Sequence, residues 1–139
     1  MEEEDRRVFL VKEVETIQSV INRISSNSFL IKGWAITLVV GTLLLKGIEI
    51  QILIAFIPTI VFWILDSYFL WQERLYRKLY DWVIENRLKT DENLFKMDTT
   101  QYKKNVSRAK TVFSWTLLCY YGSILVITTI YAVVIYSTH

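Results

Sequence analysis

Residues 52–80 read ILIAFIPTIVFWILDSYFLWQERLYRKLY, and this stretch decides the fold. It begins as an apolar run, carries one carboxylate at Asp66, and ends in the polar residues Gln72 to Arg74. About 20 apolar residues, each rising ~1.5 Å along a helix, cross a hydrocarbon layer of ~30 Å. The stretch therefore predicts a membrane-spanning helix that continues into water as a charged helix.

The remaining apolar residues are also gathered into long runs. The chain has 139 residues, of which 53% are hydrophobic, and it contains four glycines and one proline. Such blocked hydrophobicity favours membrane helices over a water-soluble core. We expect an all-α integral membrane protein with three transmembrane helices, at residues 29–45, 52–71 and 111–136, the first two joined by a short external loop, 46–51.

The polar segments are also expected to be largely helical. Residues 1–28 form a cytoplasmic amphipathic or coiled-coil helix, in which apolar positions recur at alternating steps of four and three: Leu10, Val14, Ile17, Ile21 and Ile24. This pattern fits either a coiled coil with another chain or a helix that packs on its own neighbours. Residues 72–110 form a cytoplasmic helical basic segment that contains one loop, at residues 89–102, with turn or N-cap candidates at Thr90 and Asp98. Residues 137–139 form an external tail.

Small residues repeat every four positions in the first span, at Gly33, Thr37 and Gly41. A face of this kind lets another membrane helix approach closely. Together with Ile17 and Ile21, these positions are the predicted contacts for helix packing or for a homo-oligomer.

The basic residues predict the orientation of the chain. Ten Lys or Arg residues lie between the second and third spans, five lie in the N-terminal segment up to Lys32, and only Lys46 lies on the opposite side. Cytoplasmic segments carry the excess of basic residues. We therefore expect a cytoplasmic N-terminus and an external C-terminus.

Asp66 is the candidate for a functional role, because an ionisable residue inside a membrane is costly to keep. If the hairpin centres between Ile48 and Glu49, the residue at matching depth on the first span is Ile31, which is next to Lys32. Asp66 could form an ion pair with Lys32, or a ring of Asp66 carboxylates could line the pore of an oligomer. Ser123 and Thr128 supply hydroxyls from the third span to such a pore.

The basic segment also has two interpretations. In the first, its charges only determine the orientation of the chain in the membrane and attract anionic lipid. In the second, they bind a nucleotide or a short nucleic acid. The residues expected to bind such a ligand are interleaved with aromatic residues: Arg74, Arg77, Lys78, Lys103, Lys104, Arg108 and Lys110.

Residues that carry catalysis are sparse. The one histidine is His139, and the one cysteine, Cys119, lies within an apolar run. Neither a metal-ligand spacing nor a glycine-rich phosphate loop is present in the sequence. We expect no enzyme activity, no cofactor and no metal.

Two segments carry a resemblance to a known group of proteins. SFLIKGWAITLVV (28–40) and FWILDSYFLWQERLYRKLYD (62–81) resemble small bacterial transmembrane effectors of anti-phage defence, such as the membrane effectors of Hailong systems. The resemblance covers roughly residues 15–85, and only Lys32, Asp66, Glu73 and Arg74 carry it residue by residue.

The resemblance implies an oligomeric channel in the bacterial inner membrane. A nucleic-acid-type signal from a partner nucleotidyltransferase would hold the channel shut, and phage attack would remove that signal. The alternative is a non-conducting membrane adaptor, or a transporter subunit, that recruits a cytoplasmic partner.

Overall fold

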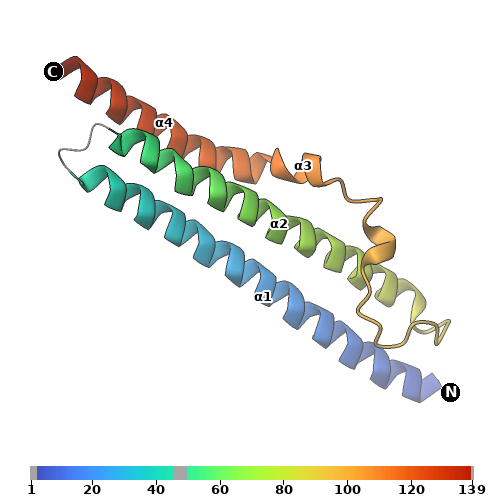
Figure 1. Ribbon diagram of the computed structural model, residues 1–139. Helices are drawn as coiled ribbons and strands as arrows, with labels where there is room; N and C mark the ends of the chain where they lie inside the picture. Colours follow the sequence, from blue (N-terminus) through green and yellow to red (C-terminus); the bar gives the residue numbers. More distant parts are fainter. Residues whose placement is uncertain (1–2, 46–49, 139) are drawn as a thin grey trace. The chain divides into compact units, whose positions relative to one another are not determined.

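The computed structural model describes residues 3–45 and 50–138. The helices follow in the order α1 (Glu3–Leu44), α2 (Gln51–Asn86), the 3₁₀ helix η1 (Thr100–Tyr102), α3 (Arg108–Val112) and α4 (Trp115–Thr138) (Figure 1). Three of them, α1, α2 and α4, are long and apolar enough to cross a membrane. The predicted all-α class with three such helices is confirmed, while most of the predicted 46–51 loop lies outside the described residues.

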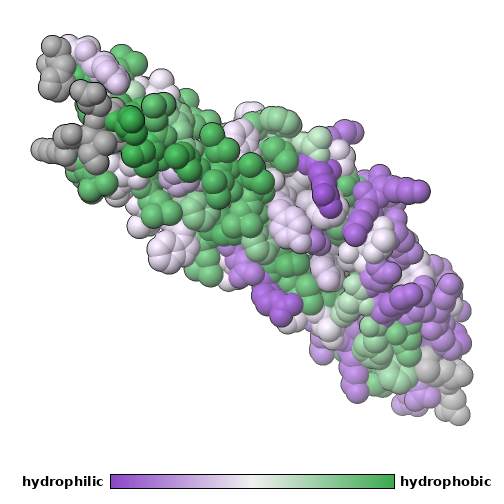
Figure 2. Space-filling view, in the orientation of Figure 1, coloured by the Kyte–Doolittle hydropathy of each residue, from purple (hydrophilic) through white to green (hydrophobic). Residues whose placement is uncertain are grey.

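The chain divides into two compact units. Unit 1 comprises residues 1–27 and 69–107, and unit 2 comprises residues 28–68 and 108–139. Within unit 2 the later part of α1, the first part of α2 and α4 lie side by side (Figure 1). On the face shown in Figure 2, hydrophobic side chains cover most of unit 2, and hydrophilic side chains gather over unit 1.

The core of unit 1 contains the apolar repeat predicted for residues 1–28. Ile17 and Ile21 are almost fully buried and pack against Leu79 and Val83 of α2, with Leu10 and Val14 at the edge of this cluster. The repeat therefore packs on the chain's own α2. A coiled coil with another chain would need side chains that this contact already covers.

At two places the helix ends in the structure do not coincide with the boundaries of the predicted segments. The N-terminal helix and the first span are one helix, α1, because no helix-breaking residue separates them. The third span does not run unbroken from residue 111: α3 ends at Val112, and α4 begins at Trp115. The Trp63 indole N–H donates to the Val112 carbonyl oxygen at 3.0 Å, which takes the acceptor that a continuous helix would use.

Within the segment 72–110, the structure has turns where the sequence predicts a loop, at residues 89–102. Helix α2 ends at Asn86, and turns, η1 and the short α3 follow. At its turns, Asp98 accepts a hydrogen bond from the Thr100 backbone N–H at 2.8 Å, and Thr90 accepts one from the Glu92 N–H at 3.1 Å. At the other end of the chain, α4 continues through Ser137 and Thr138, two residues that the sequence analysis assigned to the external tail.

Candidate functional site

The site in unit 2 is built around Asp66, which is fully buried among three apolar helices. The Lys32 ammonium from α1 lies 2.6 Å from the Asp66 Oδ2 atom. The Lys32 side chain is itself only 22% exposed, so the two charges neutralise each other in apolar surroundings. The ion pair that the sequence suggested is therefore present in the structure.

Hydroxyl groups complete the coordination of the carboxylate. Ser28 donates to Asp66 Oδ1 and accepts a hydrogen bond from the Lys32 ammonium at 2.8 Å. Tyr121 of α4 lies with its hydroxyl 3.2 Å from Asp66 Oδ2 and 3.1 Å from the Phe62 carbonyl oxygen. Each of the three helices thus contributes a polar group, which is the condition for tolerating a buried charge.

Aromatic residues of α4 close this network. The Tyr120 hydroxyl donates to the Lys32 carbonyl oxygen at 2.7 Å, and the ammonium lies 5.8 Å from the Tyr120 ring centroid. Trp63 stacks on Tyr121, with ring centroids 6.0 Å apart and planes 4° from parallel. These contacts fix the two tyrosines that face the ion pair.

The other predicted residues of unit 2 do not join this network. Ser123 is exposed and donates to the Cys119 carbonyl oxygen, while Thr128 is buried and donates to the Ile124 carbonyl oxygen. Their role in a pore stays a prediction.

The small-residue face of α1 is also separate from the ion pair. Gly33, Thr37 and Gly41 are exposed, and a Cβ atom added at either glycine would meet nothing within 4 Å. The face that α1 buries within unit 2 carries Ile31, Ala35 and Val39 instead. The small residues are therefore not used in packing within the described chain, and their role in an oligomer stays a prediction.

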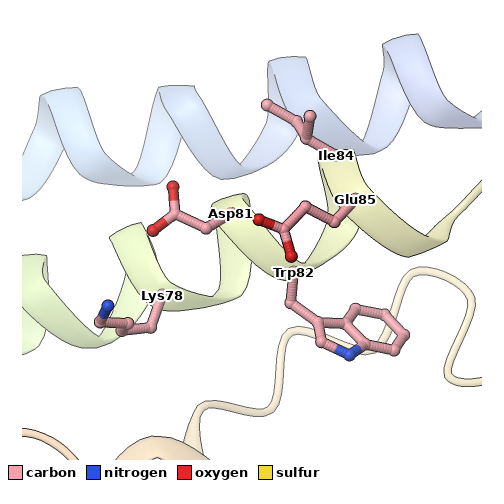
Figure 3. A pocket seen from close by; sticks show the side chains of 5 residues that line it. All are labelled: Lys78, Asp81, Trp82, Ile84 and Glu85. Atoms are coloured by element: carbon pink, nitrogen blue, oxygen red, sulfur yellow. The ribbon is translucent and has the colours of Figure 1, made fainter.

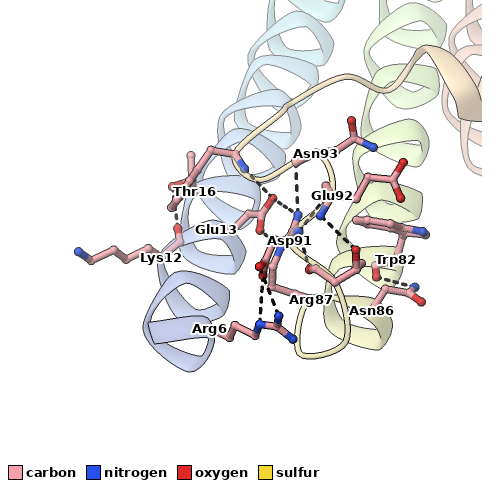
Figure 4. A network of polar contacts seen from close by, with 12 residues as sticks. Arg6, Lys12, Glu13, Thr16, Trp82, Asn86, Arg87, Asp91, Glu92 and Asn93 are labelled. Atoms are coloured by element: carbon pink, nitrogen blue, oxygen red, sulfur yellow. Dashed lines mark hydrogen bonds and ion pairs between the residues drawn. The ribbon is translucent and has the colours of Figure 1, made fainter. Parts of the chain in front are cut away.

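Unit 1 contains a second buried ion pair, which the sequence did not indicate. Arg87 of α2 is fully buried, and its Nε and Nη2 atoms lie 2.6 and 2.9 Å from the two carboxylate oxygens of Glu13, which is 2% exposed (Figure 4). Its Nη1 atom donates to the carbonyl oxygens of Thr90 and Glu92 at 3.2 and 2.8 Å. One guanidinium therefore holds α1, α2 and the connection after α2 together.

The same ion pair fixes the backbone of that connection. Glu13 also accepts the Phe95 backbone N–H at 3.2 Å, and the Phe95 ring packs edge-on against Phe9 at 5.8 Å. Asn93 and Phe95 both have positive φ, 55° and 54°, a conformation that non-glycine residues rarely adopt. An exposed ion pair between Arg6 and Asp91 adds a further link at 3.1 Å.

The predicted ligand-binding cations are divided between the two units. Arg74, Arg77, Lys78, Lys103 and Lys104 belong to unit 1, and Arg108 and Lys110 belong to unit 2. Arg77 pairs with Glu73 at 2.7 Å. Helix α2 therefore places carboxylates beside the cations that were predicted to bind a ligand.

Lys78 borders a surface hollow of about 360 Å³ that is also lined by Asp81, Trp82, Ile84 and Glu85. Figure 3 shows Lys78, Asp81 and Glu85 succeeding one another along α2, while the Trp82 ring turns toward the connection that follows the helix. Two carboxylates against one ammonium give the hollow a negative balance, which disfavours a phosphate ligand there.

Sequence reasoning found Asp66 and Lys32 but missed several of their partners. Tyr121 and Ser28 left no spacing signal, because their contacts join segments far apart in the sequence. Glu13 and Arg87 were missed for the same reason, since 74 positions separate them. Within the described residues, no cluster of His, Cys, Asp and Glu could hold a metal ion.

The fold and the site together define an all-α protein with three helices that could span a membrane and a buried charge network among them. Comparisons with protein-family models, with curated proteins and with solved structures find no match for the chain.

Proposed function

We propose that this protein is a homo-oligomeric channel of the bacterial inner membrane, with its N-terminus and the basic segment 72–110 in the cytoplasm. The observation that carries the proposal is the Lys32–Asp66 ion pair, buried between helices that are apolar enough to span a bilayer. Apolar residues at both positions would fill the same space without the cost of moving two charges out of water. Ionisable residues in such surroundings pair with one another and mark the pathways of ions and protons.

The ion pair supports a closed state. Asp66 faces inward, and its charge is cancelled by Lys32 and stabilised by the hydroxyls of Ser28 and Tyr121. Opening would separate Lys32 from Asp66, and the released carboxylates of several copies would form an acidic ring that attracts cations. The Lys32–Asp66 ion pair would thus stabilise the closed state, and the Asp66 carboxylate would line the open pore.

The gating signal comes from the cytoplasm in this proposal. Lys32 lies on α1 and Asp66 on α2, and both helices also contribute residues to unit 1. A nucleotide or short nucleic acid, made by a partner nucleotidyltransferase in anti-phage defence, would bind basic residues of unit 1 and bias the ion pair. Lys103 and Lys104, which are exposed, are the cations best placed to meet such a ligand.

Copies would meet through the small-residue face of α1. Because this face is exposed and open above both glycines, a second membrane helix can approach the backbone closely there. Gly33→Leu should weaken the assembly in detergent, while Leu38→Ala, a change at another exposed position of the same helix, should not. Native mass measurement of both variants tests this, and equal assembly of the two would exclude the face as the contact.

The channel proposal is tested by ion flux into liposomes that contain the purified protein. Asp66→Asn removes the counter-charge of Lys32 and also the carboxylate of the proposed acidic ring, so we expect resting flux to rise and its preference for cations over anions to fall. Asp81→Asn is the matched control, because Asp81 is an exposed aspartate on the same helix. Absence of flux under any condition, or equal flux from Asp66→Asn and wild type, would refute the proposal.

A second candidate function is a non-conducting adaptor, or a transporter subunit, that recruits a cytoplasmic partner. The observation that favours it is the way unit 1 holds the connection after α2. Arg87 binds three backbone carbonyl oxygens of this connection. Leu88 and Phe95 stay exposed beside these contacts. A rigid loop with exposed apolar side chains suits partner binding. A monomeric mass in lipid-like detergent would favour this function, because one copy cannot enclose a pore.

A further inference from the structure

The segment from Arg108 to Trp115 in unit 2 combines exposed cations with exposed aromatic rings. Arg108 and Lys110 of α3 are exposed, Phe113 is 66% exposed, and Trp115 is 81% exposed. Trp115 is the most exposed large hydrophobic side chain in the described part of the chain. Water is an unfavourable surrounding for such rings, whereas the headgroup layer of a bilayer favours them.

The segment is held in place from its inner side. Thr111 is buried, and the Val112 carbonyl oxygen accepts the Trp63 indole N–H at 3.0 Å. The Trp63 ring also meets the Phe113 ring edge-on, with centroids 6.5 Å apart. The break between α3 and α4 is therefore a fixed feature, and it sets the cations of α3 apart from the apolar helix that begins at Trp115.

The charge balance of unit 2 points to an anionic partner. Its described residues carry three cations, Lys32, Arg108 and Lys110, and a single carboxylate, Asp66. That carboxylate is buried against Lys32, so the exposed charged side chains among the described residues of unit 2 are the two cations of α3. Basic residues beside an apolar helix attract the phosphates of anionic lipids.

We propose that residues 108–115 form a binding surface for anionic phospholipid headgroups, with Arg108 and Lys110 attracting the phosphates and Phe113 and Trp115 lying in the interfacial layer. In this proposal Arg108 and Lys110 bind lipid, and the basic residues of unit 1 bind the gating ligand. It requires only that α4 crosses a bilayer, and it does not rest on conduction.

The test uses the full chain in vesicles made of equal parts phosphatidylcholine and phosphatidylglycerol. After mild detergent extraction, lipid mass spectrometry gives the ratio of the two lipids that stay with the protein. We expect wild type to retain an excess of phosphatidylglycerol that shrinks at high salt, as screened charge attraction requires. This measurement needs no variant.

The double variant Arg108→Gln/Lys110→Gln should lower that excess roughly 25-fold, since each of the two basic residues near a lipid surface contributes about a fivefold preference. Lys103→Gln/Lys104→Gln is the matched control, because it removes the same charge from exposed positions of unit 1 and should leave the excess nearly unchanged. The charge-keeping variant Arg108→Lys/Lys110→Arg should retain it.

Three outcomes would overturn the proposal. The first is a wild type that shows no preference between the lipids. The second is an equal loss in both glutamine variants, which would assign the effect to net charge. The third is saturable binding of a short single-stranded oligonucleotide that needs Arg108 and Lys110 while the lipid preference is absent. Loss of the lipid preference with unchanged ion flux would contradict the lipid-binding surface but not the channel. The two proposals can therefore be tested independently.

Discussion

Replacing Arg87 with methionine should release the connection that follows α2. The guanidinium is fully buried, pairs with Glu13 through two hydrogen bonds, and also binds the carbonyl oxygens of Thr90 and Glu92. Removing one partner of a buried ion pair costs about 3–5 kcal/mol, because the other charge stays buried without compensation. We expect the local opening of unit 1 to become easier by that amount.

Hydrogen exchange at the Phe95 amide is the most direct measurement, since this N–H donates to the Glu13 carboxylate. A loss of about 3–5 kcal/mol corresponds to exchange roughly 100- to 4,000-fold faster, at about 1.4 kcal/mol per factor of ten. Arg77→Met is the matched control. Arg77 also pairs with a glutamate, but its side chain is 60% exposed, so its pair should contribute only about 0.3–0.5 kcal/mol.

A second variant separates charge from packing. Glu13→Leu/Arg87→Met removes both charges and fills the space with apolar side chains, so it should recover much of the stability that the single change loses. If Arg87→Met accelerates exchange at Phe95 by less than about tenfold, or if the double variant opens more easily than the single one, the buried pair is not what holds this connection.

Three further predictions concern packing in unit 1, the polar network around Asp66 and the pH dependence of Asp98. Ile17→Ala should lower the stability of unit 1 by about 2–5 kcal/mol, whereas Val11→Ala, at a position 55% exposed, should change it little; thermal unfolding in detergent compares the two. Tyr121→Phe removes the hydroxyl that faces the buried carboxylate and should cost about 1 kcal/mol in the same assay; no loss would mean that the hydroxyl contributes nothing. The pKa of Asp98 is held below its ordinary value of 3.8 by hydrogen bonds from Thr100 and, to a lesser extent, by nearby lysines. Because the folded pKa is the lower one, the stability that this group contributes is present above 3.8 and is lost as pH falls through the folded value. An NMR titration should therefore find a low pKa that rises in Thr100→Ala, and an unchanged value in that variant would contradict the cause.

The three long helices could be predicted from the sequence because each depends on composition over many residues. A run such as 52–71 needs only enough apolar residues to cross a hydrocarbon layer, and single substitutions do not alter that conclusion. The apolar repeat through Ile17 and Ile21 was readable for a similar reason, since a helix must bury such a stripe against something. Composition does not choose the partner, so only the structure shows that the stripe packs on α2.

Boundaries and polar partners were harder to predict because single contacts decide them. The break after Val112 depends on one indole N–H from Trp63, which lies 49 positions away. Arg87 looked like one of many surface cations, because the basic segment is rich in them and nothing nearby marks it as buried. Asp66 was found by contrast, since a lone carboxylate within an apolar run is conspicuous.

The two buried ion pairs explain why α1 and α2 pack in one register within each unit. Apolar contacts such as Ile17 against Val83 would survive a shift of one helical turn, because aliphatic side chains of similar size succeed one another along both helices. A charged pair would not, since a shift of about 5.4 Å separates the groups and leaves both buried alone. Unit 1 is fixed by Glu13 of α1 with Arg87 of α2, and unit 2 by Lys32 of α1 with Asp66 of α2, so the two helices exchange the roles of acid and base between the units. In the channel that we propose, a gate that shifts α1 along α2 would have to break at least one ion pair. The Lys32–Asp66 pair is the one expected to yield, because the Lys32 side chain keeps 22% exposure while Arg87 keeps none.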